Sequence, residues 1–145
     1  QIEGDVWTIP AELMKGRLGK TAEFRVPLSG PALEVIDKAR PMARDGFLFP
    51  SVRKGVISDA TMSRLMERRS MEARPHGFRS SFRDWIAETT NTPYEVAESA
   101  LGHVVGGSVE RAYRRTDHLE QRRALMNRWA DVVTGNQNEK IVRLR

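Results

Sequence analysis

Hydrophobic positions in the first thirty residues follow the short runs of strands rather than the period of a helix. Residues 6–9 (VWTI) end at a proline, and residues 24–28 (FRVPL) follow a polar connection that contains Gly16 and Gly19. Two such runs around a glycine-bearing loop predict an antiparallel β-hairpin over residues 5–28.

Beyond residue 30 the apolar spacing changes to that of amphipathic helices. The clearest stripe has the spacing i, i+4, i+7 and i+8, which places its members on one helical face. It consists of Phe78, Phe82, Trp85 and Ile86. Further helices are predicted from the sets Leu33, Ile36 and Met42; Met62, Leu65 and Met66; Tyr94, Val96, Ala97, Ala100 and Leu101; Val109 and Ala112; and Leu119, Met126, Trp129 and Val133. The predicted class is mainly α with a small antiparallel β-hairpin or sheet (α+β), with a helical bundle over residues 30–135.

Capping and breaking residues set the expected boundaries of the first helix. Ser29 and Pro31 predict its start, and Gly46 lies beyond its predicted end. Residues 47–49 (FLF) are expected to form a short buried strand or loop. Residues 136–145 have few groups to pack and are predicted to be a mobile or partner-docking tail.

Composition narrows the functional classes. The 145 residues include 24 Lys and Arg against 19 Asp and Glu, which gives a net charge of +5, and there is no cysteine. A disulfide scaffold, a thiolate metal site and a cysteine nucleophile are therefore excluded, and the apolar runs are too short to span a membrane. Of the 24 basic residues 19 are Arg, whose planar guanidinium suits phosphate. The chain begins Gln1-Ile2-Glu3-Gly4 with no signal peptide, and it is expected to be part of something longer.

Two charged side chains lie at the start of the stripe-bearing helix. His76 and Arg79 are three residues apart, so on a helix that begins near Pro75 they share one face. Free backbone N–H groups at a helix N-terminus also favour anions, which makes the pair a candidate phosphate site. A capping histidine beside a solvated arginine is the alternative.

Two further residues lie where the apolar stripes do not explain them. His103 follows Leu101-Gly102, so it is displayed on a turn at a helix end. Tyr113 comes ten residues later, and residues 111–128 contain six Arg. Nearby cations favour a phenolate. The alternatives are a solvated loop histidine and a surface tyrosine.

In this order and spacing the motifs resemble the C-terminal signature of tyrosine recombinases, the phage-integrase family. The signature is His-x-x-Arg, then Leu-Gly-His, then a tyrosine ten residues on. Residues 76–85 (HGFRSSFRDW), 112–115 (AYRR) and 122–126 (RRALM) are similar to the prophage and genomic-island branch of that family. The resemblance runs from the first strand to Gly135 and implies a tyrosine-recombinase catalytic-domain fold, truncated at its N-terminus.

The resemblance implies a mechanism. Tyr113 attacks a DNA phosphodiester and forms a 3′-phosphotyrosyl intermediate with a free 5′-hydroxyl, so rejoining needs no cofactor and no metal. Arg79 and His103 stabilise the non-bridging oxygens. His76 assists proton transfer at the nucleophile, and Lys15 protonates the leaving oxygen.

The family's lysine acid lies near the turn of its β-hairpin. Lys15 is the preferred match and Lys20 is the rival, because the turn here is extended by residues 16–19. Solvated hairpin lysines are the alternative for both.

Partners also follow from the resemblance. They are duplex DNA at attachment sites and other copies of the enzyme in a tetramer, in the bacterial cytoplasm at the nucleoid. The basic clusters at 64–83 and 111–128 are suited to DNA phosphates. The candidate DNA-binding residues are Arg74, Arg83, Arg114 and Arg115.

The sequence departs from the family in two respects. The family's first arginine belongs to a helix upstream of the hairpin, for which Arg17 and Arg25 are no match, and its DNA-clamping N-terminal domain is absent. We therefore expect little strand cleavage by these residues alone. A non-catalytic basic DNA-binding module and a type IB topoisomerase remain alternatives, whereas a metal-dependent nuclease is disfavoured because the three histidines lack metal-ligand spacing.

Overall fold

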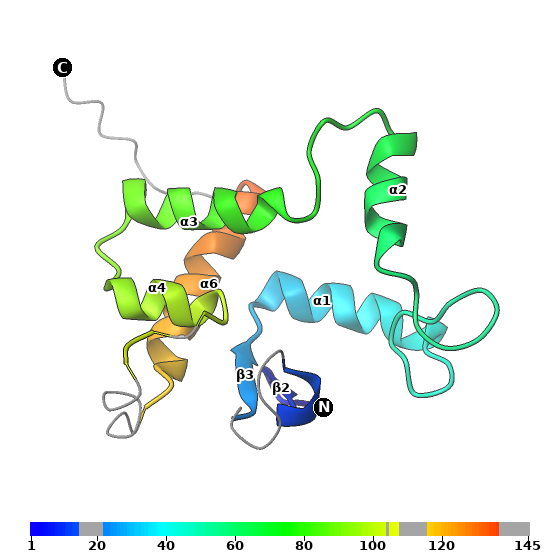
Figure 1. The fold of residues 1–145 in the computed structure, drawn as a ribbon, viewed down its shortest axis with the longest axis horizontal. Helices are drawn as coiled ribbons and strands as arrows, with labels where there is room; N and C mark the ends of the chain where they lie inside the picture. The colour runs from blue at the N-terminus through cyan, green and yellow to red at the C-terminus, as the bar shows by residue number, and fades with distance from the viewer. Residues whose placement is uncertain (15–21, 104, 108–115, 137–145) are drawn as a thin grey trace.

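The computed structural model describes residues 1–14, 22–103, 105–107 and 116–136 (Figure 1). Within these ranges the chain is a mixed structure with a three-stranded antiparallel sheet and five α-helices, which agrees with the predicted α+β class. The strands are β1 (Ile2–Glu3), β2 (Val6–Ile9) and β3 (Phe24–Pro27). The α-helices are α1 (Gly30–Ala39), α2 (Ala60–Arg68), α3 (Gly77–Thr89), α4 (Tyr94–Ala100) and α6 (Leu119–Thr134), with 3-10 turns η1 (Ala11–Leu13) and η2 (Arg40–Met42).

The predicted hairpin is confirmed. β2 pairs antiparallel with β3, from Val6 opposite Pro27 to Ile9 opposite Phe24. β1 adds a third strand on the other side of β2, and the order is β1-β2-β3. The sequence did not predict β1, because two residues are too few to show alternation. Gly4, with φ of +56°, makes the turn between β1 and β2.

Helix α1 begins where predicted and ends earlier. Ser29 occupies the N-cap position in an extended conformation, and Pro31 lies in the first turn. Pro41 has no N–H to continue the helical ladder, so α1 gives way after Ala39 to η2. Met42, predicted for the buried face, is consequently 63% exposed.

Residues 47–49 form a loop rather than a strand, in a segment where a single bridge joins Arg44 and Phe47. The loop alternative is therefore confirmed, but the expected burial is wrong. Phe47 and Phe49 are exposed. Figure 1 shows this segment between α1 and α2, at the edge of the fold.

Helix α2 forms as predicted but buries only part of its stripe. Met66 is 5% exposed, whereas Met62 and Leu65 are exposed. Figure 1 shows α2 apart from α3 and α4, at the far end of α1. Most of its apolar face therefore has no helix of the bundle to pack against.

The hydrophobic core lies where α3, α4 and α6 meet. Its buried cluster consists of Phe82, Ile86, Ala97 and Leu125. Two indoles cover this cluster: the rings of Trp85 and Trp129 have centroids 5.1 Å apart, and Trp129 lies 5.4 Å from the ring of Phe82. Tilted aromatic pairs at these distances add to the free energy of burial. The predicted stripe of α3 is thus largely confirmed.

Three further members of the predicted apolar sets are exposed. Phe78 is 54% exposed, Tyr94 is 63% exposed and Val133 is 60% exposed. Phe78 lies in the first turn of α3 and Val133 in the last turn of α6. Spacing shows which helical face a residue occupies, but it does not show whether another element covers that part of the face.

The charged side chain of Arg122 is itself buried, with 1% of its surface exposed. Its Nε donates to the backbone oxygen of Asp117 at 2.8 Å, and its Nη1 donates to the backbone oxygen of Arg25 at 2.7 Å. Its Nη2 donates to the Asp117 carboxylate at 3.2 Å, and its guanidinium lies 5.1 Å from the ring centroid of Phe24. Burial lowers the pKa of Arg122, and the Asp117 carboxylate partly opposes this. The guanidinium nevertheless remains charged. Arg122 therefore ties the start of α6 to β3.

This burial corrects the prediction that the whole cluster at 111–128 is suited to DNA phosphates. Arg122 is covered and its donors point inward. Arg123 is also engaged, because it pairs with Asp5 and with Glu120. Both arginines therefore make contacts within the fold.

We predict that Arg122→Lys lowers the free energy of unfolding by about 3 kcal/mol, because an ammonium keeps the buried charge but cannot reach all three acceptors. Urea unfolding followed by tryptophan fluorescence measures the change. Arg64→Lys, at an exposed position on α2, is the matched control and should change it by less than about 0.5 kcal/mol. Equal unfolding midpoints for the two variants would contradict the structural role of Arg122.

Candidate functional site

The first turn of α3 presents His76 and Arg79 to solvent. His76 is the N-cap residue of α3 and has helical φ and ψ, and both side chains are exposed. Their i, i+3 spacing therefore places them on one face of the helix start. The side chain of His76 makes no capping hydrogen bond.

The end of α4 presents His103. The helix stops after Ala100, and Gly102 adopts φ of +69°, a left-handed conformation that side-chain-bearing residues rarely adopt. The backbone N–H of His103 then donates to the carbonyl of Glu98 at 2.9 Å, which closes the turn. The His103 side chain is 48% exposed, as a histidine displayed on a helix-ending turn should be.

The structure brings Arg79 and His103 together although 24 positions separate them. Nη2 of Arg79 lies 2.7 Å from Nε2 of His103 and donates to the backbone oxygen of Leu101, also at 2.7 Å. The Nε–H and the N–H groups of Nη1 have no acceptor among the described residues. Since the side chain is exposed, these donors are available to an anion from solvent.

Glu98 lies behind this pair, on α4. One carboxylate oxygen is 2.7 Å from Nδ1 of His103, and the other accepts from Nε of Arg83 at 2.7 Å. The His103 hydrogen bond lowers the pKa of Glu98 below its ordinary value; burial opposes this, and Arg83 adds to the lowering. The carboxylate is therefore ionised at neutral pH, and it is only 13% exposed.

Two predicted DNA-binding arginines are engaged within the protein. Arg83 is held by Glu98 and lies with its guanidinium 5.5 Å from the ring centroid of Tyr94. Nη1 of Arg74 donates to the backbone oxygens of Met71, Glu72 and Ala73. The chain segment before α3 is thereby folded around Arg74, and any role of these arginines toward DNA stays a prediction.

Several predicted residues lie outside the described ranges. These are the nucleophile Tyr113, the hairpin acid Lys15 with its rival Lys20, and the DNA-binding candidates Arg114 and Arg115. The residues beyond 136 of the predicted tail are also outside them.

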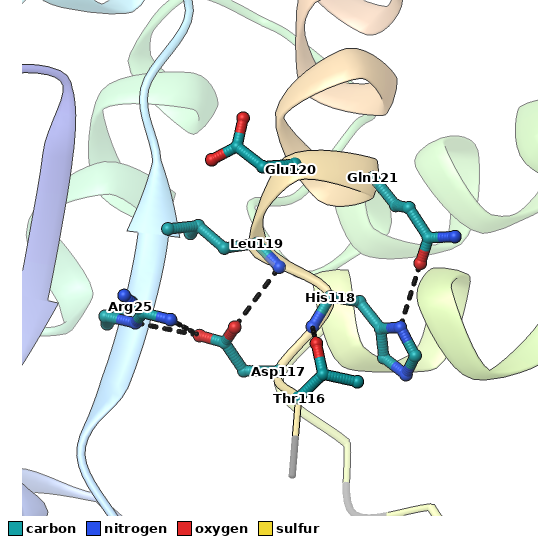
Figure 2. A pocket seen from close by; sticks show the side chains of 7 residues that line it. All are labelled: Arg25, Thr116, Asp117, His118, Leu119, Glu120 and Gln121. Carbon is teal, nitrogen blue, oxygen red and sulfur yellow. Dashed lines mark hydrogen bonds and ion pairs between the residues drawn. The ribbon is translucent and has the colours of Figure 1, made fainter.

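A separate pocket of about 710 Å³ lies at the start of α6 and is lined by Arg25 and residues 116–121 (Figure 2). Figure 2 shows the Asp117 carboxylate between Arg25 and the backbone N–H of Leu119. One carboxylate oxygen lies 2.8 Å from Nη2 of Arg25, and the other accepts from the Leu119 nitrogen at 3.2 Å. Asp117 also pairs with Arg122, and Glu120 pairs with Arg123, so the charged groups at this pocket already have partners within the protein. The pocket contains neither Arg79 nor His103, so we place the candidate site at that pair instead.

The described residues contain neither a candidate metal site nor a membrane-spanning helix. No three His, Asp or Glu side chains in them come close enough to hold a metal ion. None of their helices is both long enough and apolar enough to cross a membrane.

Glu98 is the site residue that sequence reasoning missed. It lies five positions before His103, so about one and a half helical turns separate them if the helix continues. An acid five residues before a histidine on a turn can indicate a contact between the two side chains. The contact forms only if the turn folds the chain back toward the helix. Only the left-handed Gly102 makes the two side chains meet.

Curated integrases are similar in sequence to this chain over most of its length. No family model and no solved structure matches the chain. Prophage integrase IntA of Escherichia coli K12 is 36% identical over 141 residues, which is 94% of this chain and 33% of that protein. Prophage integrase IntZ of the same organism is 30% identical and the integrase of Enterobacteria phage P4 is 29% identical, each over 94% of this chain and 35% of the relative. The resemblance to phage integrases is therefore confirmed, and the chain spans about a third of the length of these curated relatives.

We predict that the stabilising effect of Glu98 depends on pH in an acid range. Because its folded pKa is lowered, its ionisation stabilises the fold above the ordinary pKa of about 4.5, and this contribution is lost as the pH falls through the folded pKa. Glu98→Gln should cost about 1–2 kcal/mol of unfolding free energy at pH 7 and less at pH 3.5, because part of the contribution of the carboxylate is lost below its ordinary pKa.

Urea unfolding of both proteins at the two pH values measures the difference. Glu95→Gln, an exposed change on the same helix, controls for net charge and should show no comparable loss. A wild-type advantage that is equal at both pH values would refute the assignment.

Proposed function

Because this chain is similar over 94% of its length to prophage and phage integrases, we propose that it is the catalytic part of a tyrosine-type site-specific DNA recombinase. The proposed fold is that of the tyrosine-recombinase catalytic domain. The substrates are two duplex DNA sites, and the biological outcome is integration or excision of a mobile element. The active assembly is a tetramer of the full-length protein on DNA.

The proposed reaction is a phosphoryl transfer without net hydrolysis. The Tyr113 oxygen attacks the phosphorus of a phosphodiester, its phenolic proton passes to a base, and the bond from phosphorus to the 5′-oxygen breaks. The 5′-oxygen takes up a proton and leaves as a hydroxyl, while the 3′-phosphate stays bound to the tyrosine. Attack by the 5′-hydroxyl of a second duplex reverses these steps and rejoins the strands.

The contact between Arg79 and His103 is the observation that carries the proposal. One group from α3 and one from the turn after α4 meet at an exposed point. Arg79 keeps donors that no described residue uses, which is what a phosphate oxygen requires. Preorganised donors of this kind stabilise charge as it develops in the transition state.

The remaining roles follow from the resemblance and the chemistry of the side chains. His76, one helical turn before Arg79, assists proton transfer at the nucleophile. Lys15, or its rival Lys20, protonates the leaving oxygen. His103 donates to a non-bridging oxygen from Nε2, and this requires an added proton because its Nδ1 faces Glu98.

The test traps the covalent intermediate. The chain is extended upstream to the length of its relatives and incubated with nicked duplexes of randomised central sequence, from which the short 5′-hydroxyl strand escapes. We expect a detergent-stable protein–DNA adduct, with the phosphotyrosine located at Tyr113 by peptide mass spectrometry. Sequencing the trapped DNA identifies the preferred site.

Variants make the result specific. Tyr113→Phe should abolish the adduct, and Arg79→Lys should lower its yield about 10²–10³-fold. Arg40→Lys, whose side chain is exposed and pairs with Asp37, should leave the yield unchanged. Binding without any adduct in the extended chain would favour the non-catalytic DNA-binding module, and relaxation of supercoils without strand exchange would favour a topoisomerase.

A further inference from the structure

The carboxylate of Glu98 is fully committed within the protein. Each of its oxygens has a different partner, one being Nδ1 of His103 and the other Nε of Arg83. Arg83 is in turn held against the ring of Tyr94. With a side chain only 13% exposed, Glu98 has neither the space nor a free oxygen to turn elsewhere.

The hydrogen bonds define which nitrogen of His103 carries its proton. A guanidinium can only donate, so the Nε2 atom that lies 2.7 Å from Nη2 of Arg79 must be a bare acceptor. The proton of the neutral imidazole is then on Nδ1. That N–H donates to Glu98, whose ionised carboxylate can only accept. The contacts with Arg79 and with Glu98 therefore require the same tautomer of His103, with the proton on Nδ1.

We propose that Glu98 is a positioning residue for this site. It holds the imidazole of His103 with Nδ1–H directed inward, so that Nε2 is held against the guanidinium of Arg79 at the exposed side of the pair. Its catalytic consequence rests on the proposed function: when His103 takes up a second proton to donate to a phosphate, the carboxylate is already in place to balance that charge.

Because Arg83 occupies one oxygen of Glu98, a second acceptor oxygen is needed to hold the Nδ1–H of His103. A carboxylate has two such oxygens, whereas an amide has one. In Glu98→Gln the single carbonyl oxygen is required by Nε–H of Arg83, so the amide NH₂ is left facing Nδ1. Nδ1 must then become the acceptor, and the proton moves to Nε2, where it opposes the donors of Arg79. A near-isosteric substitution should therefore reverse the tautomer.

Long-range ¹H–¹⁵N correlation spectra of the 145-residue chain at pH 8 test this directly. The wild type should show His103 with a protonated Nδ1 and a bare Nε2, and no variant is needed for this measurement. A protonated Nε2 in the wild-type spectrum would overturn the proposal. His118, whose Nδ1 contacts Gln121 instead, serves as an internal reference.

Three variants then separate positioning from general stability. Glu98→Gln should move the proton to Nε2, whereas Glu95→Gln should not. Adding Arg83→Met to Glu98→Gln frees the amide oxygen to face Nδ1–H and should restore the wild-type tautomer. A residue that only stabilised the fold would not be rescued by removal of a second side chain, so an unchanged tautomer in Glu98→Gln, or no restoration in the double variant, would overturn the proposal.

The adduct assay links positioning to chemistry. In the extended chain Glu98→Gln should lower the yield of the Tyr113 adduct about 10-fold to 100-fold, with Glu95→Gln unchanged. If the tautomers behave as stated but the wild type forms no adduct, the recombinase function fails and the positioning by Glu98 stands. A wild type that forms the adduct while Glu98→Gln retains both its yield and its tautomer refutes the positioning role alone.

Discussion

The buried guanidinium of Arg122 is the constraint on which the arrangement of the elements depends. A charge that is 1% exposed must have its donors satisfied by the protein. The acceptors that satisfy it come from β3 and from the residues that precede α6. Because the guanidinium also covers the ring of Phe24, the sheet and the last helix cannot shift independently.

This connection extends to the candidate site. Phe24 lies beside Gly102, since a Cβ at that glycine would be 3.6 Å from its ring. The turn that displays His103 is therefore built against the same strand that Arg122 holds. On its other side the turn is attached to α3, because Arg79 donates to the backbone oxygen of Leu101. The site thus joins elements that the core and the buried arginine have already placed.

The candidate site and the described pocket illustrate two different kinds of surface. The pocket at the start of α6 is concave, yet its carboxylates and cations already neutralise one another. The Arg79 and His103 pair is exposed, and Arg79 retains donors that no residue in the described ranges accepts from. For a polyanion as large as duplex DNA, available positive donors matter more than concavity. Electrostatics therefore locates the site better than shape does.

The local pattern of hydrophobic, capping and breaking residues in the sequence determined much of the secondary structure and part of the core. The hairpin strands, the starts of α1 and α3 and the residues Phe82, Trp85 and Ile86 are all readable from spacing and capping. The motif order around Arg79 and His103 likewise identified the resemblance to integrases before any contact was known. These features are local in sequence or depend only on order along the chain.

Only the tertiary structure decided which charged side chains face inward. Arg122 and Arg123 are adjacent and identical in type, yet one is buried at 1% exposure and the other is partly exposed. The five-residue spacing between Glu98 and His103 could indicate their contact, but nothing in the sequence shows that Glu98 also binds Arg83. The physical reason is that the free energy of a charge depends on how fully its hydrogen bonds are satisfied, and those partners come from segments far apart in the chain.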